Sequence, residues 1–188
     1  VVTGGSVGIG KAIALCLAQE GVDVAICARR KDVLDDTAAE IARATNRKIV
    51  PLVADLTKTE DANAFIEGAA EALGRIDILV NNAGAAAGGT LESLTDDDWE
   101  AALALKFFGY VRCTRAVVPY MKKQGGGRVV NLIGNDGVKP SYWEVAPGAA
   151  NAAGQNLTMS LAGQYGPDNI TFAAVNPGPV RTERWDGV

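Results

Sequence analysis

A glycine-rich turn near the start of the chain limits the possible fold more than any other feature. The sequence TGGSVGIG covers residues 3–10, follows a short apolar segment and runs into a helix-like stretch at residues 11–20. Glycines let the backbone turn sharply and approach a ligand closely, and the first N–H groups of the following helix favour an anion. A glycine pattern alone would indicate only a tight turn. Its position between a strand and a helix favours a pyrophosphate-binding site.

The rest of the chain alternates apolar, strand-like runs with helical stretches. We expect strands at residues 22–28, 48–54, 76–80, 128–133 and 170–175, and helices at residues 32–44, 57–73, 95–123 and 146–165. Regular alternation predicts βαβ units that form a parallel sheet with helices on both faces. We therefore predict an α/β, doubly wound Rossmann-type fold with three αβα layers. A single NAD(P)-binding domain would cover residues 1–188, with an apparently truncated C-terminal end.

Composition and charge exclude several functional classes. The net charge of −4 argues against nucleic acid or an anionic membrane as a partner, and no apolar run approaches the roughly 18 residues of a membrane span. The chain has no histidine, which removes the commonest metal ligand and the commonest general base. The three cysteines show no CxxC spacing and are expected to be free thiols in the cytoplasm. We predict no metal site.

Several segments resemble the short-chain dehydrogenase/reductase family, and they occur in the family's order. The turn is similar to the TGxxxGxG pattern; further matches are Asp55 after the third strand, Asn81-Asn82-Ala83-Gly84 after the fourth, Asn131 in the fifth and NPGPVRT at residues 176–182. The resemblance covers essentially the whole chain. It implies an NAD(P)-dependent oxidoreductase that transfers hydride to or from a small carbonyl or alcohol, or an activated C=C bond. It also implies that family members carry a substrate loop, a helix and a seventh strand at the C-terminal end.

The same resemblance implies which residues contact the cofactor. They lie in the turn, at the ends of the second to fourth strands, and in the final segment: Gly4, Ser6, Gly8, Ile9, Gly10, Arg29, Asp55, Leu56, Asn82, Ala83, Gly84, Pro177, Gly178, Val180 and Thr182. In the family, Asp55 would touch the adenine and Thr182 would bond the nicotinamide carboxamide. Ala28 stands where an acid would bond the 2′-hydroxyl of NAD, and Arg29 follows it, which favours NADP over NAD. The alternative is that Arg29 and Arg30 are only solvated surface charges.

The residues that carry out the family's chemistry are missing from their positions. Counting from Asn131 places the serine at Gly134, the tyrosine at Pro147 and the lysine at Asn151, while the helical asparagine falls at Lys106. No tyrosine anywhere in the chain has a lysine four residues later. The sequence is therefore identified as an atypical member of the family that lacks the Asn-Ser-Tyr-Lys set.

Other residues are candidates for part of that chemistry. Lys106 would face the nicotinamide side, where a desolvated lysine can act as an acid. Tyr142 lies in a loop that leads to the site, and Asn151 could bond the ribose hydroxyls. Asn135 and Asp136 are flanked by glycines and are interpreted as turn formers.

Three functions are compatible with this pattern. The first is an oxidoreductase with a non-standard proton donor, and the second is a non-catalytic dinucleotide-binding protein, such as a sensor or the silent partner in an oligomer. The third is a lyase-type reaction on the same fold with Lys106 as the base. The helices at 95–123 and 146–165 resemble the pair that family members pack into oligomers, so we expect a homodimer or homotetramer.

Overall fold

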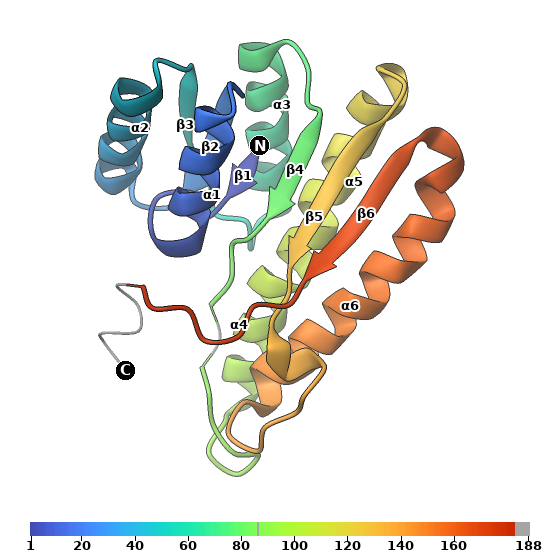
Figure 1. The fold of residues 1–188 in the computed structure, drawn as a ribbon. Coiled ribbons are helices and arrows are strands. Elements are labelled where there is room, and N and C mark those ends of the chain that lie inside the picture. The colour runs from blue at the N-terminus through green and yellow to red at the C-terminus, as the bar shows by residue number, and fades with distance from the viewer. Residues whose placement is uncertain (86, 183–188) are drawn as a thin grey trace.

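Six parallel strands form the centre of the molecule, in the order β3-β2-β1-β4-β5-β6 (Figure 1). The computed structural model describes residues 1–85 and 87–182. The strands are β1 (Val2–Thr3), β2 (Val24–Ala28), β3 (Ile49–Val53), β4 (Ile78–Asn81), β5 (Gly127–Leu132) and β6 (Ile170–Val175). The strand order reverses between β1 and β4, and in such sheets the carboxyl ends at the reversal form the ligand crevice. The predicted Rossmann-type sheet is confirmed.

Helices cover both faces of the sheet, because successive side chains of a strand point to opposite faces. Val24 and Ile26 pack with α1 (Gly8–Gln19) and α2 (Lys31–Thr45) in one apolar cluster. Ala25 and Cys27 belong to the opposite cluster with α3 (Thr59–Leu73) and α5 (Phe108–Lys123). Helix α6 (Val145–Tyr165) packs beside β6. Within the described residues, no helix is long and apolar enough to cross a membrane.

The prediction of one helix over residues 95–123 is wrong. The segment divides at Phe107 into α4 (Asp96–Lys106) and α5. A short 3₁₀ turn, η1 (Asn135–Gly137), follows β5 and packs against α6. A capping box between Thr95 and Asp98 starts α4. The two halves pack on different partners, since α5 lies against α3 and the sheet while α4 lies against α6. Phe107 itself stays in the right-handed helical region, with φ of −104° and ψ of −61°.

Helix α3 begins two residues later than the sequence predicts. The Asp55 carboxylate accepts hydrogen bonds from the Thr57 amide (3.1 Å) and hydroxyl (2.8 Å), and this local turn holds residues 55–57 outside the helix. The helix ends at Gly74, which adopts a left-handed conformation with φ of 80°. The side chain of Asp55 is thereby fixed at the carboxyl end of β3, at the same edge of the sheet as the glycine-rich turn.

Candidate functional site

The glycine-rich turn joins β1 to α1 at the carboxyl edge of the sheet. Gly4 and Gly8 have positive φ angles of 66° and 57°, which favour glycine. A Cβ atom on Gly10 would lie 2.1 Å from the Gly4 carbonyl oxygen, so only glycine allows α1 to approach the turn this closely. Val7 stands at the N-cap and supplies no side-chain oxygen, which leaves the first N–H groups of α1 for a ligand. The geometry suits an anion.

The segment after β4 is fastened to this turn by four hydrogen bonds. The Thr3 hydroxyl accepts from the backbone amides of Asn82 (2.8 Å) and Ala83 (2.9 Å). The Asn82 side-chain amide donates to the carbonyls of Thr3 (2.9 Å) and Gly4 (3.2 Å). The Asn82 side chain therefore holds the glycine-rich turn against the segment that follows β4. Thr3 was not among the predicted site residues, although it is the first letter of the matched pattern.

Asp55 and Arg29 lie at the outer side of the same edge, where the sequence predicts the adenosine end of the cofactor. Burial alone raises the pKa of Asp55, but the Thr57 hydrogen bonds and the charges of Lys58 and Arg29 outweigh it and lower that pKa below its usual value. Arg29 is exposed at the end of β2. Leu56, in contrast, is only 4% exposed and belongs to the core.

Residues 176–182 cross the site from β6 toward α1, as Figure 1 shows. The Asn176 side-chain amide donates to Gln155 Oε1 (3.1 Å), and the Pro177 carbonyl accepts from the Asn135 amide (3.1 Å). At the far end, the Thr182 methyl group lies 3.6 Å from the position of a Cβ on Gly8. The segment thus spans the distance from the loop after β5 to the glycine-rich turn.

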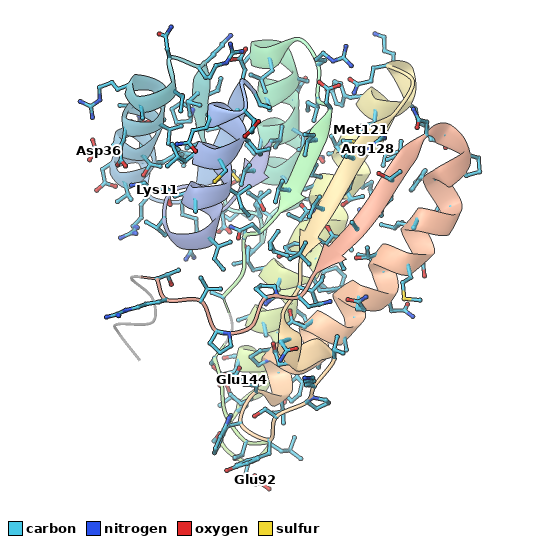
Figure 2. The ribbon with its side chains drawn as sticks, in the orientation of Figure 1. Lys11, Asp36, Glu92, Met121, Arg128 and Glu144 are labelled. Atoms are coloured by element: carbon cyan, nitrogen blue, oxygen red, sulfur yellow. The ribbon has the colours of Figure 1, made fainter. Side chains whose placement is uncertain are left out.

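The two predicted proton donors lie in different surroundings. The aliphatic chain of Lys106 packs against Gly84, whose added Cβ would lie 3.3 Å from Lys106 Cδ, so Lys106 borders the end of β4. Tyr142 is 68% exposed and its ring packs against Trp143 at 4.1 Å between centroids. The Trp143 carbonyl accepts from the Gly89 amide (2.7 Å), and Figure 2 shows the next residue, Glu144, where α6 begins. Tyr142 therefore lies on an outer loop.

Asn151 is buried and hydrogen-bonded to the loop that follows β5. Its side chain is 1% exposed, and its amide donates to Asp136 Oδ2 at 2.8 Å. A Cβ on Gly134 would lie 2.5 Å from Asn151 Nδ2 and 2.7 Å from Asp136 Oδ1. Pro147 is buried in the first turn of α6, where a helix does not require its N–H. The sequence suggested ribose binding for Asn151 and only a turn for Asp136; it did not reveal their contact.

Buried amides order the strand ends behind this contact. Asn81 and Asn131 are neighbours in register on β4 and β5, and the Asn81 amide donates to Asn131 Oδ1 (2.9 Å). The Asn131 amide donates in turn to the Thr158 hydroxyl of α6 (2.8 Å). These bonds hold α6, and with it Asn151, in fixed relation to the sheet. Among the described residues, no group of three His, Cys, Asp or Glu side chains could hold a metal ion.

The sheet order and the three converging segments define a protein of the Rossmann class. The chain belongs to the short-chain dehydrogenase family, whose model matches residues 1–188, and it is an oxidoreductase of that family. It is 34% identical over 182 residues to the 3-oxoacyl-[acyl-carrier-protein] reductase FabG of Thermotoga maritima, which covers 97% of this chain and 74% of that protein. The family membership predicted from the sequence is confirmed.

Solved structures give the same result. L-Sorbose reductase from Gluconobacter frateurii, complexed with NADPH and L-sorbose, superposes with a TM-score of 0.95 at 32% identity and covers 98% of this chain and 70% of its own. NAD⁺-bound xylitol dehydrogenase superposes with a TM-score of 0.91 at 31% identity, over 94% of this chain and 68% of its own. Structures of relatives thus contain NADPH in one case and NAD⁺ in another.

Proposed function

We propose that the protein binds NADP(H) along the carboxyl edge of its sheet and transfers hydride between this cofactor and a small carbonyl, alcohol or activated C=C substrate. The observation that carries the proposal is the convergence of residues 3–10, 81–84 and 176–182. Asn82 fastens the first two segments together, and Thr182 of the third lies beside Gly8. If the glycine-rich turn only joined β1 to α1, residues 176–182 would have no reason to reach it.

The preference for NADP rests on the end of β2. Ala28 offers no carboxylate to the ribose 2′-hydroxyl, and the exposed guanidinium of Arg29 is available to a 2′-phosphate. The positive charge of Arg29 is one of the causes that lower the pKa of Asp55, so the two side chains lie near each other at this edge of the sheet. NAD is the alternative cofactor, as in the xylitol dehydrogenase structure.

We infer that the proton donor differs from the family's usual one. Gly134, Pro147 and Asn151 occupy the positions that the resemblance assigns to serine, tyrosine and lysine. Glycine, proline and a side-chain amide do not exchange protons near neutral pH. Lys106, beside Gly84, is one candidate for the role, and Tyr142 is a second if its loop closes over the substrate.

A non-catalytic dinucleotide-binding protein is the second candidate function. The observation that favours it is the simultaneous absence of the serine, tyrosine and lysine from positions 134, 147 and 151. Such a protein would bind NADPH through the same turn and would turn over no substrate.

Titration with NADPH, NADP⁺ and NADH, followed by assays at the nicotinamide absorbance band, tests both functions. We expect NADPH to bind more tightly than NADH, and at least one substrate in a panel of carbonyls, alcohols and enones to change the absorbance. Binding without turnover across the panel would favour the non-catalytic function, whereas failure to bind either dinucleotide would contradict both.

We also propose that the protein is a cytoplasmic homodimer or homotetramer. Helices α5 and α6 border a surface groove whose lining includes the apolar residues Val118, Leu157 and Leu161 together with charged residues such as Arg115 and Lys122. A second copy would bury this surface. A monomer by light scattering at micromolar concentration would contradict the proposed assembly.

A further inference from the structure

We propose that the Asp136 carboxylate exchanges the substrate proton in this site and that Asn151 is its positioning residue. The inference rests on the proposed hydride-transfer function and names the group that replaces the missing donor. It assigns a chemical role to a residue for which the sequence indicated only a turn.

The first observation is the space that Asp136 occupies. Gly134 follows β5, at the position where the family resemblance implies a serine that faces the substrate. A Cβ there would lie 2.7 Å from Asp136 Oδ1, closer than side chains tolerate. The carboxylate of Asp136 therefore lies against the start of any side chain at position 134, together with the Asn151 amide, whose Nδ2 would be 2.5 Å from the same Cβ. An acidic oxygen stands in the place of the serine.

The second observation is the neighbouring segment. The amide of Asn135, the residue next to Asp136, donates to the Pro177 carbonyl at 3.1 Å. This segment contains Thr182, the residue that the family resemblance assigns to the nicotinamide carboxamide. Asp136 thus directly follows a residue that is hydrogen-bonded to this segment.

The third observation is the way the carboxylate is held. The Asn151 amide donates to Oδ2 at 2.8 Å, which leaves Oδ1 on the side of Gly134. Asn151 is 1% exposed and projects from α6, which the Asn131–Thr158 hydrogen bond fixes to the sheet. The amide bond to Oδ2 orients the carboxylate and leaves Oδ1 as a hydrogen-bond acceptor for another group.

The reaction balances with these groups. In the oxidative direction, the substrate O–H proton passes to Asp136 Oδ1 while the C–H hydrogen leaves as hydride to NADP⁺, forming the carbonyl and NADPH. Asp136 then releases the proton to water. In the reductive direction, the protonated Asp136 gives its proton to the carbonyl oxygen as hydride arrives at the carbon, and it regains a proton from water.

The test uses the whole protein with NADP(H) and whichever substrate of the panel it turns over. Asp136→Asn keeps the size of the side chain and removes its ability to accept a proton, so kcat is expected to fall by about 10²-fold or more. The dissociation constant of NADPH is expected to stay within about threefold, because Asp136 is not a cofactor contact in the proposal. Asp36→Asn, the same change on the exposed outer side of α2, is the matched control and should leave kcat unchanged (Figure 2).

Two further variants separate chemistry from structure. Asp136→Ala should regain part of its kcat when formate is added, since a small carboxylate can occupy the vacated space, and a merely structural residue would not respond. Asn151→Leu should lower kcat with little change in KM, because it frees Asp136 without removing it. If Asp136→Asn does not fold, these two variants still test whether Asp136 exchanges the substrate proton.

The outcomes distinguish this inference from the proposed function. An active wild-type protein in which Asp136→Asn matches Asp36→Asn overturns the role of Asp136, and an accompanying loss in Lys106→Met would assign the proton to Lys106. A wild-type protein that binds NADPH and turns over no substrate overturns the hydride-transfer function, and this inference with it.

Discussion

Replacing Gly10 by alanine tests the closest backbone approach in the site. The added Cβ would lie 2.1 Å from the Gly4 oxygen and 2.5 Å from Asn82 Nδ2, whereas real Cβ contacts are essentially never below 3.0 Å. Neither neighbour is the free end of a flexible side chain, since Gly4 contributes backbone and Asn82 is held by its hydrogen bonds. The start of α1 or the turn must therefore move by about 1 Å.

The energetic cost follows from the bonds that this movement stretches. Asn82 donates to Thr3 and Gly4 at 2.9 and 3.2 Å, and each such bond contributes about 0.5–1.5 kcal/mol to stability. Alanine gains about 1 kcal/mol over glycine in a helix, which offsets part of the loss. We expect the free energy of unfolding to fall by about 1–2 kcal/mol once backbone displacement is included.

Urea unfolding measures this change, with Gly163→Ala as the matched control. Gly163 lies in α6 and a Cβ there would meet nothing within 4 Å, so this variant should gain up to about 1 kcal/mol. NADPH affinity should fall at least about tenfold in Gly10→Ala and remain unchanged in Gly163→Ala, because only the first displaces the N–H groups of the turn. A Gly10→Ala protein as stable as Gly163→Ala, with full affinity, would refute the close approach.

Three other perturbations give distinct results. Arg29→Met should cost about 1–3 kcal/mol of NADPH affinity and leave NADH affinity unchanged, with Arg30→Met as the control; equal losses for both dinucleotides would contradict the 2′-phosphate contact. Asn131→Leu should lower the free energy of unfolding by about 1–3 kcal/mol, because buried partners in Asn81 and Thr158 lose a hydrogen bond; an unchanged urea midpoint would show that these bonds add nothing. The lowered pKa of Asp55 means that its charge stabilises the fold above about pH 4, and this stability is lost as the pH falls through the native pKa. Asp55→Asn should therefore lose less stability than the wild type between about pH 5 and pH 3, as followed by acid titration of fluorescence; parallel curves would contradict it.

The fold was predictable because local patterns determine most of it. Short stretches of sequence show which residues must be buried and where the backbone must turn. These local signals are enough to predict the strand before the glycine-rich turn, the helix after it and the alternation of strands and helices that follows. The division at Phe107 was not predictable in this way. It depends on α4 and α5 packing against different partners, α6 for the first and α3 with the sheet for the second.

The site was predictable where it depends on backbone and unpredictable where it depends on side chains from distant elements. Gly4, Gly8 and Gly10 appear in the sequence as a pattern, and in the structure Gly4 and Gly8 have positive φ while Gly10 allows α1 to approach the turn closely. Asp136 and Asn151 are fifteen residues apart and belong to a loop and a helix. Their sequence neighbourhoods indicate a turn and a small-residue helix, so only the packing of α6 on η1 reveals that they meet.

The contact between Gly134, Asp136 and Asn151 also bears on whether the protein is a catalyst. A site that had only lost its side chains would leave unfilled space at position 134, but here the carboxylate of Asp136 and the amide of Asn151 fill it and hydrogen-bond to each other. A serine at 134 would need both side chains to move. A lysine at 151 would be buried beside Asp136 and would pair with its charge, which would remove the free carboxylate oxygen from proton exchange. Glycine at 134, aspartate at 136 and asparagine at 151 therefore form a mutually dependent set. This dependence favours a rebuilt proton-exchange site over a vacant one.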